Sequence, residues 1–224
     1  MVAVLLPIVF NLILVLSIDQ IIEFWRGTLV FWVGKLDFGA EVHMRAFDLA
    51  YFDLWVPAIF VEGKLPSPTT WWITAGTCVI VFLLTYLIKP NKGLPFIYLL
   101  RAIILLQSAA LIYFAFIPAS FPHPLEDYVT SNLFVGIMFI ALIPWLLGGT
   151  YYLFEFSLVK KIALTILIMG FFIVALPLQY LLHACLIAHG SLLFMPVLYL
   201  VFGSYIDVLA FIALFSYGLS FKWQ

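Results

Sequence analysis

The chain has 224 residues, of which 66% are hydrophobic and 9% are charged, whereas a soluble domain has roughly 45–50% apolar and about 25% charged residues. This composition excludes a soluble globular domain. Its 10 Lys and Arg residues and 11 Asp and Glu residues leave no basic excess to neutralise phosphates, so nucleic-acid binding is not expected. The chain is predicted to be an integral membrane protein that crosses the bilayer several times.

Six apolar segments approach the length of about 20 residues that a helix needs to cross the hydrocarbon layer. They cover residues 2–23, 71–88, 95–117, 131–152, 160–182 and 190–220. The segments between these spans are too short to require a second domain. The sequence therefore predicts an all-α fold, in which residues 1–224 form a single membrane domain with a six-transmembrane-helix bundle.

The stretch from about residue 24 to residue 70 is the only part large enough to form structure outside the bilayer. Residues 21–33 are too interrupted to span again and suit an interfacial helix. Residues 46–55 mix aromatic and acidic side chains with no clean period of two or 3.6, so their structure stays open. We expect an outer loop region of about 45 residues that packs on the membrane surface.

Lysines predict the orientation, because cytoplasmic connections of membrane proteins are enriched in basic residues. Five Lys residues in the short connections and at the C-terminal end fall on one side: Lys89, Lys92, Lys160, Lys161 and Lys222. The long 24–70 region on the other side holds Arg26, Lys35, Arg45 and Lys64 beside five carboxylates, but the rule is weakest for long loops. With an even number of crossings, both termini are cytoplasmic and the 24–70 region is outside, in the setting of a bacterial inner membrane. Tryptophans agree with this topology, since Trp25, Trp55 and Trp71 fall at the predicted outer boundary.

All four histidines fall on the predicted outer side, together with nine of the eleven carboxylates. The metal-ligand candidates are His43, His123, His183 and His189. The candidate catalytic residues are His123, Glu126, Asp127, His183 and His189. The alternative is that these groups have no shared function, because the positive-inside rule does not keep acidic residues or histidines from the outer side. His183 and His189 also point about 120° apart on a helix, so they converge only if the helix breaks between them.

Two ionisable side chains fall inside the predicted bilayer segments, Arg101 in the third and Asp207 in the sixth. Intramembrane ionisable groups usually pair or carry function, so one prediction is a buried pair between them. The alternatives are that Arg101 extends alone to the headgroups and that Asp207 is protonated and hydrogen-bonded to a neighbouring helix. A proton or ion relay needs more ionisable residues along the path than these two.

Three classes of function remain open. The first is a non-catalytic subunit or assembly partner of a membrane complex, which is favoured because no motif is complete. The second is a membrane enzyme that acts at the outer face on a lipid-linked substrate through histidine and carboxylate groups. The third is a transporter, for which few polar residues could line a path. The expected partners are the lipid bilayer and other membrane protein subunits, and the sequence identifies no cofactor.

Overall fold

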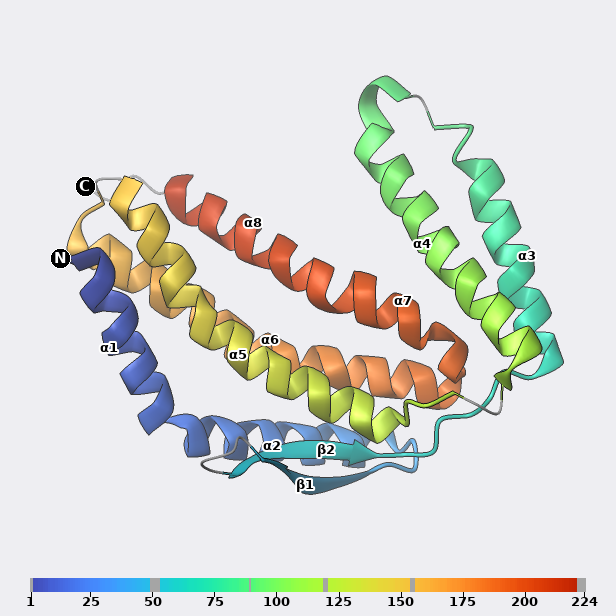
Figure 1. Cartoon of the computed structure of the whole chain (residues 1–224), viewed down its shortest axis with the longest axis horizontal. Coiled ribbons are helices and arrows are strands. Elements are labelled where there is room, and N and C mark those ends of the chain that lie inside the picture. Colours follow the sequence, from blue (N-terminus) through green and yellow to red (C-terminus); the bar gives the residue numbers. More distant parts are fainter. Residues whose placement is uncertain (1, 49–52, 89, 119–120, 154–155, 221–224) are drawn as a thin grey trace. The chain divides into compact units, whose positions relative to one another are not determined.

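The computed structural model describes residues 2–48, 53–88, 90–118, 121–153 and 156–220 (Figure 1). Helices account for most of them. The elements in chain order are α1 (Val2–Leu16), α2 (Ile18–Leu36), β1 (Glu41–Asp48), β2 (Asp53–Phe60), α3 (Pro68–Leu84), α4 (Pro90–Phe116), α5 (Leu125–Leu153), α6 (Leu158–His189), η2 (Leu192–Phe194), α7 (Met195–Tyr199), η3 (Leu200–Tyr205) and α8 (Ile206–Ser220).

Four stretches of helix are long and apolar enough to cross a membrane. They are Gly93–Phe116, Leu125–Tyr152, Leu158–His189 and Leu192–Ser220. The bent pair α1 and α2 adds a fifth candidate if the two helices count as one span, and α3 is apolar but shorter. The multi-pass helical prediction is therefore confirmed, whereas the count of six spans stays a prediction.

The first predicted helix, residues 2–23, does not continue as one helix. α1 ends at Leu16, α2 begins at Ile18, and the two are bent by 58°. Ser17 between them has φ −106° and ψ 8°, outside the helical region. Asp19 then lies in the first turn of α2, where a carboxylate is stabilised by the positive end of the helix dipole.

The expected outer loop region is largely regular structure. α2 continues to Leu36 and ends at Asp37, whose φ of 43° is left-handed, and Gly39 follows at φ 70°. β1 and β2 then form an antiparallel hairpin, with Glu41 opposite Phe60 and Asp48 opposite Asp53. The sequence left this structure open because β2 buries Val56 through Ile59 consecutively, so the alternation that marks a half-buried strand is missing.

The chain divides into two compact units. Unit 1 contains residues 1–60, 126–182 and 208–224, and unit 2 contains residues 61–125 and 183–207. The single membrane domain stays a prediction.

In unit 1, α2 buries one stripe of side chains, Ile22, Trp25, Leu29 and Val33, at helical spacing. The hairpin packs on α2. Helices α5 and α6 pack closely where Gly136 lies beside Leu176, and the Tyr151 hydroxyl bonds to the Lys161 carbonyl (2.9 Å) near their connection.

In unit 2, α3 and α4 form an antiparallel pair. Trp71 at the start of α3 donates its indole N–H to the Leu111 carbonyl of α4 (2.9 Å), and Thr85 at the end of α3 contacts Arg101 of α4. Ser67 caps α3 by accepting a hydrogen bond from the Thr70 amide (3.1 Å), which is why the helix begins three residues before the predicted span.

The last predicted helix, 190–220, is interrupted. Its first half runs through η2, α7 and the π-helical segment η3 before α8 begins at Ile206. Pro196 has no amide hydrogen, and Gly203, with φ −98° and ψ −109°, departs from helical geometry. Asp207 consequently lies in the first turn of α8, directly after the break.

Candidate functional site

An ion-pair cluster joins the hairpin to α5 in unit 1. The Arg45 guanidinium, on β1, pairs with Asp127 and also lies 3.9 Å from a carboxylate oxygen of Glu126. Both carboxylates are in the first turn of α5, where the helix dipole stabilises negative charge. Two of the predicted catalytic residues are therefore held by a cation from the region expected to be a loop.

An aromatic contact lies beside this cluster. The Phe47 ring stacks on Phe134 with 4.6 Å between ring centroids and 11° between planes. Arg45 and Phe47 are two residues apart on β1 and so share a face, while Asp127 and Phe134 are seven apart on α5 and also share a face. One face of β1 is thus attached to one face of α5 by a polar and an apolar contact.

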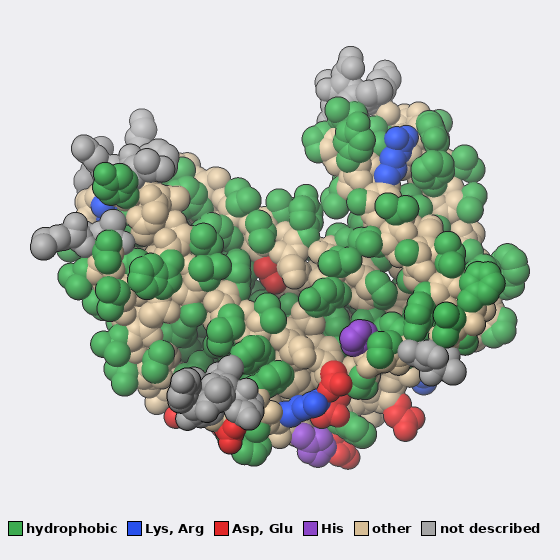
Figure 2. All heavy atoms as spheres, viewed as in Figure 1, with side chains coloured by type: hydrophobic (Ala, Val, Ile, Leu, Met, Phe, Trp, Pro, Cys, Tyr) green, Lys and Arg blue, Asp and Glu red, His purple; other side chains and the backbone are tan. Residues whose placement is uncertain are grey.

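Figure 2 shows acidic, basic and histidine side chains gathered over the hairpin and the beginning of α5, on a surface that is otherwise largely hydrophobic. His43 belongs to this surface, and its Nε2 lies 3.1 Å from a carboxylate oxygen of Glu41 on the same strand. The pair is exposed to solvent. Such pairs contribute about 0–1 kcal/mol, so this contact alone explains little of the stability.

The other histidines lie in unit 2. His123 is exposed and packs edge-on against the Phe121 ring, with 5.8 Å between centroids. His183 is buried and His189 is exposed, and both lie within α6 rather than in a connection after residue 182. Because α6 continues unbroken to His189, the two rings project about 120° apart and do not converge. Residues 183–189, which the predicted spans 160–182 and 190–220 leave as a connection, are therefore helical, and their place on the outer side stays a prediction.

His189 bonds within its own helix turn. Its Nδ1 lies 3.0 Å from the Cys185 carbonyl oxygen and 3.6 Å from the Cys185 sulfur. An Nδ1–H that donates to the carbonyl does not act as a base toward the thiol. Over the described part of the chain, no group of three or more His, Cys, Asp or Glu residues lies close enough together to hold a metal ion.

Arg101 contacts the end of α3. Its Nε–H donates to the Thr85 hydroxyl (3.3 Å), and its guanidinium carbon lies 5.0 Å and 5.8 Å from the ring centroids of Tyr86 and Phe82. Asp207 is buried. The ion pairs found among the described residues do not include one between Arg101 and Asp207, and that pairing stays a prediction for experiment.

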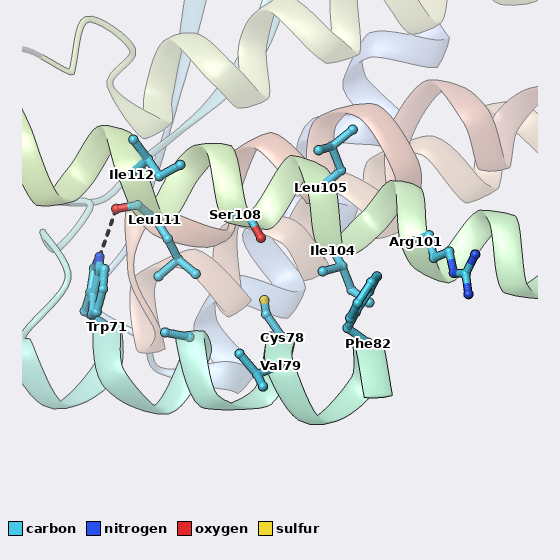
Figure 3. A pocket seen from close by; sticks show the side chains of 11 residues that line it. Trp71, Cys78, Val79, Phe82, Arg101, Ile104, Leu105, Ser108, Leu111 and Ile112 are labelled. Atoms are coloured by element: carbon cyan, nitrogen blue, oxygen red, sulfur yellow. Dashed lines mark hydrogen bonds between the residues drawn. The ribbon is translucent and has the colours of Figure 1, made fainter. Parts of the chain in front are cut away.

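A groove of about 640 Å³ runs between α3 and α4 (Figure 3). Trp71 lies at one end and Arg101 at the other, and Cys78 and Ser108 face one another between them. Most of the remaining lining is aliphatic or aromatic. The sequence pointed to Arg101 but not to the groove, because the groove depends on which faces of the two helices meet.

These features define a multi-pass α-helical membrane protein that also contains a β-hairpin. No protein-family model, no curated protein and no solved structure matches the chain.

Proposed function

We propose that this protein is a non-catalytic subunit or assembly partner of a membrane complex. It presents a platform, defined here as α2 together with the hairpin β1–β2, to another membrane protein. The observation that carries the proposal is the contact of Arg45 with Asp127 and Glu126. This contact gives Asp127 and Glu126 a structural role, because it attaches the hairpin to the beginning of α5.

The platform also has a surface suited to protein contact. Trp55 is 53% exposed and Phe60 is 51% exposed on β2, although four consecutive residues between them are buried. Aromatic residues are enriched in protein interfaces, and an exposed Trp is a frequent source of binding energy. A rigid scaffold that displays two exposed aromatic rings supports recognition of a partner better than it supports chemistry.

The orientation is part of the same proposal. Gly218 lies against Leu164, so the end of α8 and the beginning of α6 share one end of unit 1. Lys160 and Lys161 lie at that end, and Lys222 follows α8 in the sequence. Basic residues favour the cytoplasmic side. Both termini are then cytoplasmic, and the hairpin, which contacts the first turn of α5, is outside, which in a bacterial inner membrane is the periplasmic side.

Site-specific photo-crosslinking in native membranes tests the function. A photoreactive amino acid replaces Trp55 or Phe60 in the full-length chain, and Trp145, a half-exposed residue of α5, provides a matched control. We expect the two platform positions to give the same discrete protein adduct and the control position to give none. Absence of an adduct at both platform positions, with normal membrane levels of the protein, would reject the proposal.

A further inference from the structure

The groove between α3 and α4 has the dimensions of a lipid chain. It extends along α4 from Arg101 to Ile112, which is about 16 Å at 1.5 Å per residue. That length is about half of a hydrocarbon layer about 30 Å thick, which is one leaflet. Apart from Arg101, Cys78 and Ser108, its lining is apolar, so its middle favours methylene groups over water.

Arg101 gives one end of the groove a fixed positive charge. The residue is half-buried and lies eight positions after Gly93, where the apolar span begins, or about 12 Å along the helix. Its contact with Thr85 places the guanidinium at the C-terminal end of α3. A long arginine side chain at this depth extends toward the headgroups while its methylene stem stays in apolar surroundings.

The guanidinium has donors left for a ligand. It carries five N–H groups, and Thr85 is the one hydrogen-bond acceptor that the described residues offer it. None of the ion pairs among those residues involves Arg101. An arginine inside a membrane protein is stabilised by an anionic partner, and the planar guanidinium matches a phosphate particularly well.

We infer that this groove holds one acyl chain of an anionic phospholipid, whose phosphate accepts hydrogen bonds from Arg101. The cation at one end and the apolar channel that leads away from it match the two parts of such a lipid. The Tyr86 and Phe82 rings, 5.0 Å and 5.8 Å from the guanidinium carbon, add cation–π contacts that support the position of Arg101. This inference concerns unit 2 and does not depend on the proposed function of the platform.

Native mass spectrometry of the full-length protein tests the inference. Protein freed of lipid by detergent exchange is titrated with phosphatidylglycerol, and separately with phosphatidylcholine that has the same chains. We expect the wild-type protein to bind phosphatidylglycerol about tenfold more tightly, the usual scale of a charge-assisted pair. Arg101→Gln should remove this preference. Arg26→Gln, which changes an exposed arginine of α2 paired with Glu23, should keep it.

A second variant tests the groove without changing the charge. Ala75 lines the groove, so Ala75→Phe fills it, whereas Ala102→Phe adds the same ring to an exposed position of α4 as a control. We expect Ala75→Phe to weaken binding of both lipids and Ala102→Phe to leave both unchanged. Equal binding by the wild-type protein and Ala75→Phe would overturn the inference.

Asp207 provides the last arm of the test. If a carboxylate of the same chain were the partner of Arg101, Asp207→Asn would free the guanidinium and strengthen phosphatidylglycerol binding. We expect Asp207→Asn to leave that affinity unchanged. A gain of about tenfold in this variant, or a lipid preference that survives in Arg101→Gln, would overturn the inference.

Discussion

The indole Nε1–H of Trp25, in α2, donates a hydrogen bond of 2.7 Å to the carbonyl of Ile173, in the middle of α6. In a regular helix this carbonyl would accept a hydrogen bond from the amide of residue 177. That residue is Pro177, which has no amide hydrogen. Trp25 therefore satisfies a backbone group that proline leaves open, and membrane helices tolerate interior prolines where a neighbour does this.

The Trp25–Ile173 bond predicts an energetic coupling with Pro177. Trp25→Phe leaves the Ile173 carbonyl without its donor and should lower the free energy of unfolding by about 1–3 kcal/mol. In a Pro177→Ala background the new amide can bond to that carbonyl, so the same substitution should cost about 1 kcal/mol less. A double-mutant cycle by thermal unfolding in detergent measures the difference.

Trp32 provides the control for this cycle. It lies on the same helix and is partly exposed, so Trp32→Phe should cost the same in both backgrounds. If Trp25→Phe and Pro177→Ala gave purely additive losses, the hydrogen bond would have no part in stabilising the kinked helix.

Two glycines of α5 predict opposite effects of the same substitution. A Cβ at Gly136 would lie 2.8 Å from a methyl of Leu176, which is fully buried, so the Leu176 side chain would have to shift within the packed contact. Gly136→Ala should therefore destabilise the protein by about 1–3 kcal/mol through overpacking. A Cβ at Gly149 meets nothing within 4 Å, so Gly149→Ala should be neutral or stabilising, because alanine favours helix more than glycine. Equal unfolding temperatures for the two variants would contradict the α5–α6 contact.

The orientation predicts that α3 crosses the membrane although it has only 17 residues. Ser67→Cys and Asn91→Cys, made with Cys78 and Cys185 replaced by alanine, should be reached by an impermeant thiol reagent from opposite faces. Ser67 should react in intact spheroplasts and Asn91 only after the membrane is opened. Reaction of both from one face would show that α3 enters and leaves on the same side.

The sequence predicted the long apolar helices but not their ends. Hydropathy identifies the apolar residues of a span, but the end of a helix depends on where its backbone hydrogen bonds end. α6 therefore extends to His189, beyond the predicted end at residue 182. The break at Ser17 was missed for the same reason, because apolar residues lie on both sides of it.

The contacts that organise the candidate site depend on residues far apart in the sequence. Arg45 and Asp127 are separated by 82 positions, and no local pattern brings them together. Trp25 was assigned to the outer boundary by its residue type, yet it is buried against α6. Pro177 did indicate such a contact, because it leaves the Ile173 carbonyl without an intrahelical donor, and a group on another helix must then supply one.

The most direct test of the assembly-partner proposal exchanges the charges of Arg45 and Asp127 and measures the photo-crosslink from Trp55. Arg45→Asp places three carboxylates together and should weaken the adduct several-fold, whereas the double variant Arg45→Asp with Asp127→Arg restores an opposite pair and should recover it. The exposed pair adds less than about 1 kcal/mol to overall stability, so both variants should reach the membrane at normal levels. A folded double variant that still gives no adduct would contradict the proposal, because the restored ion pair would then not restore partner contact.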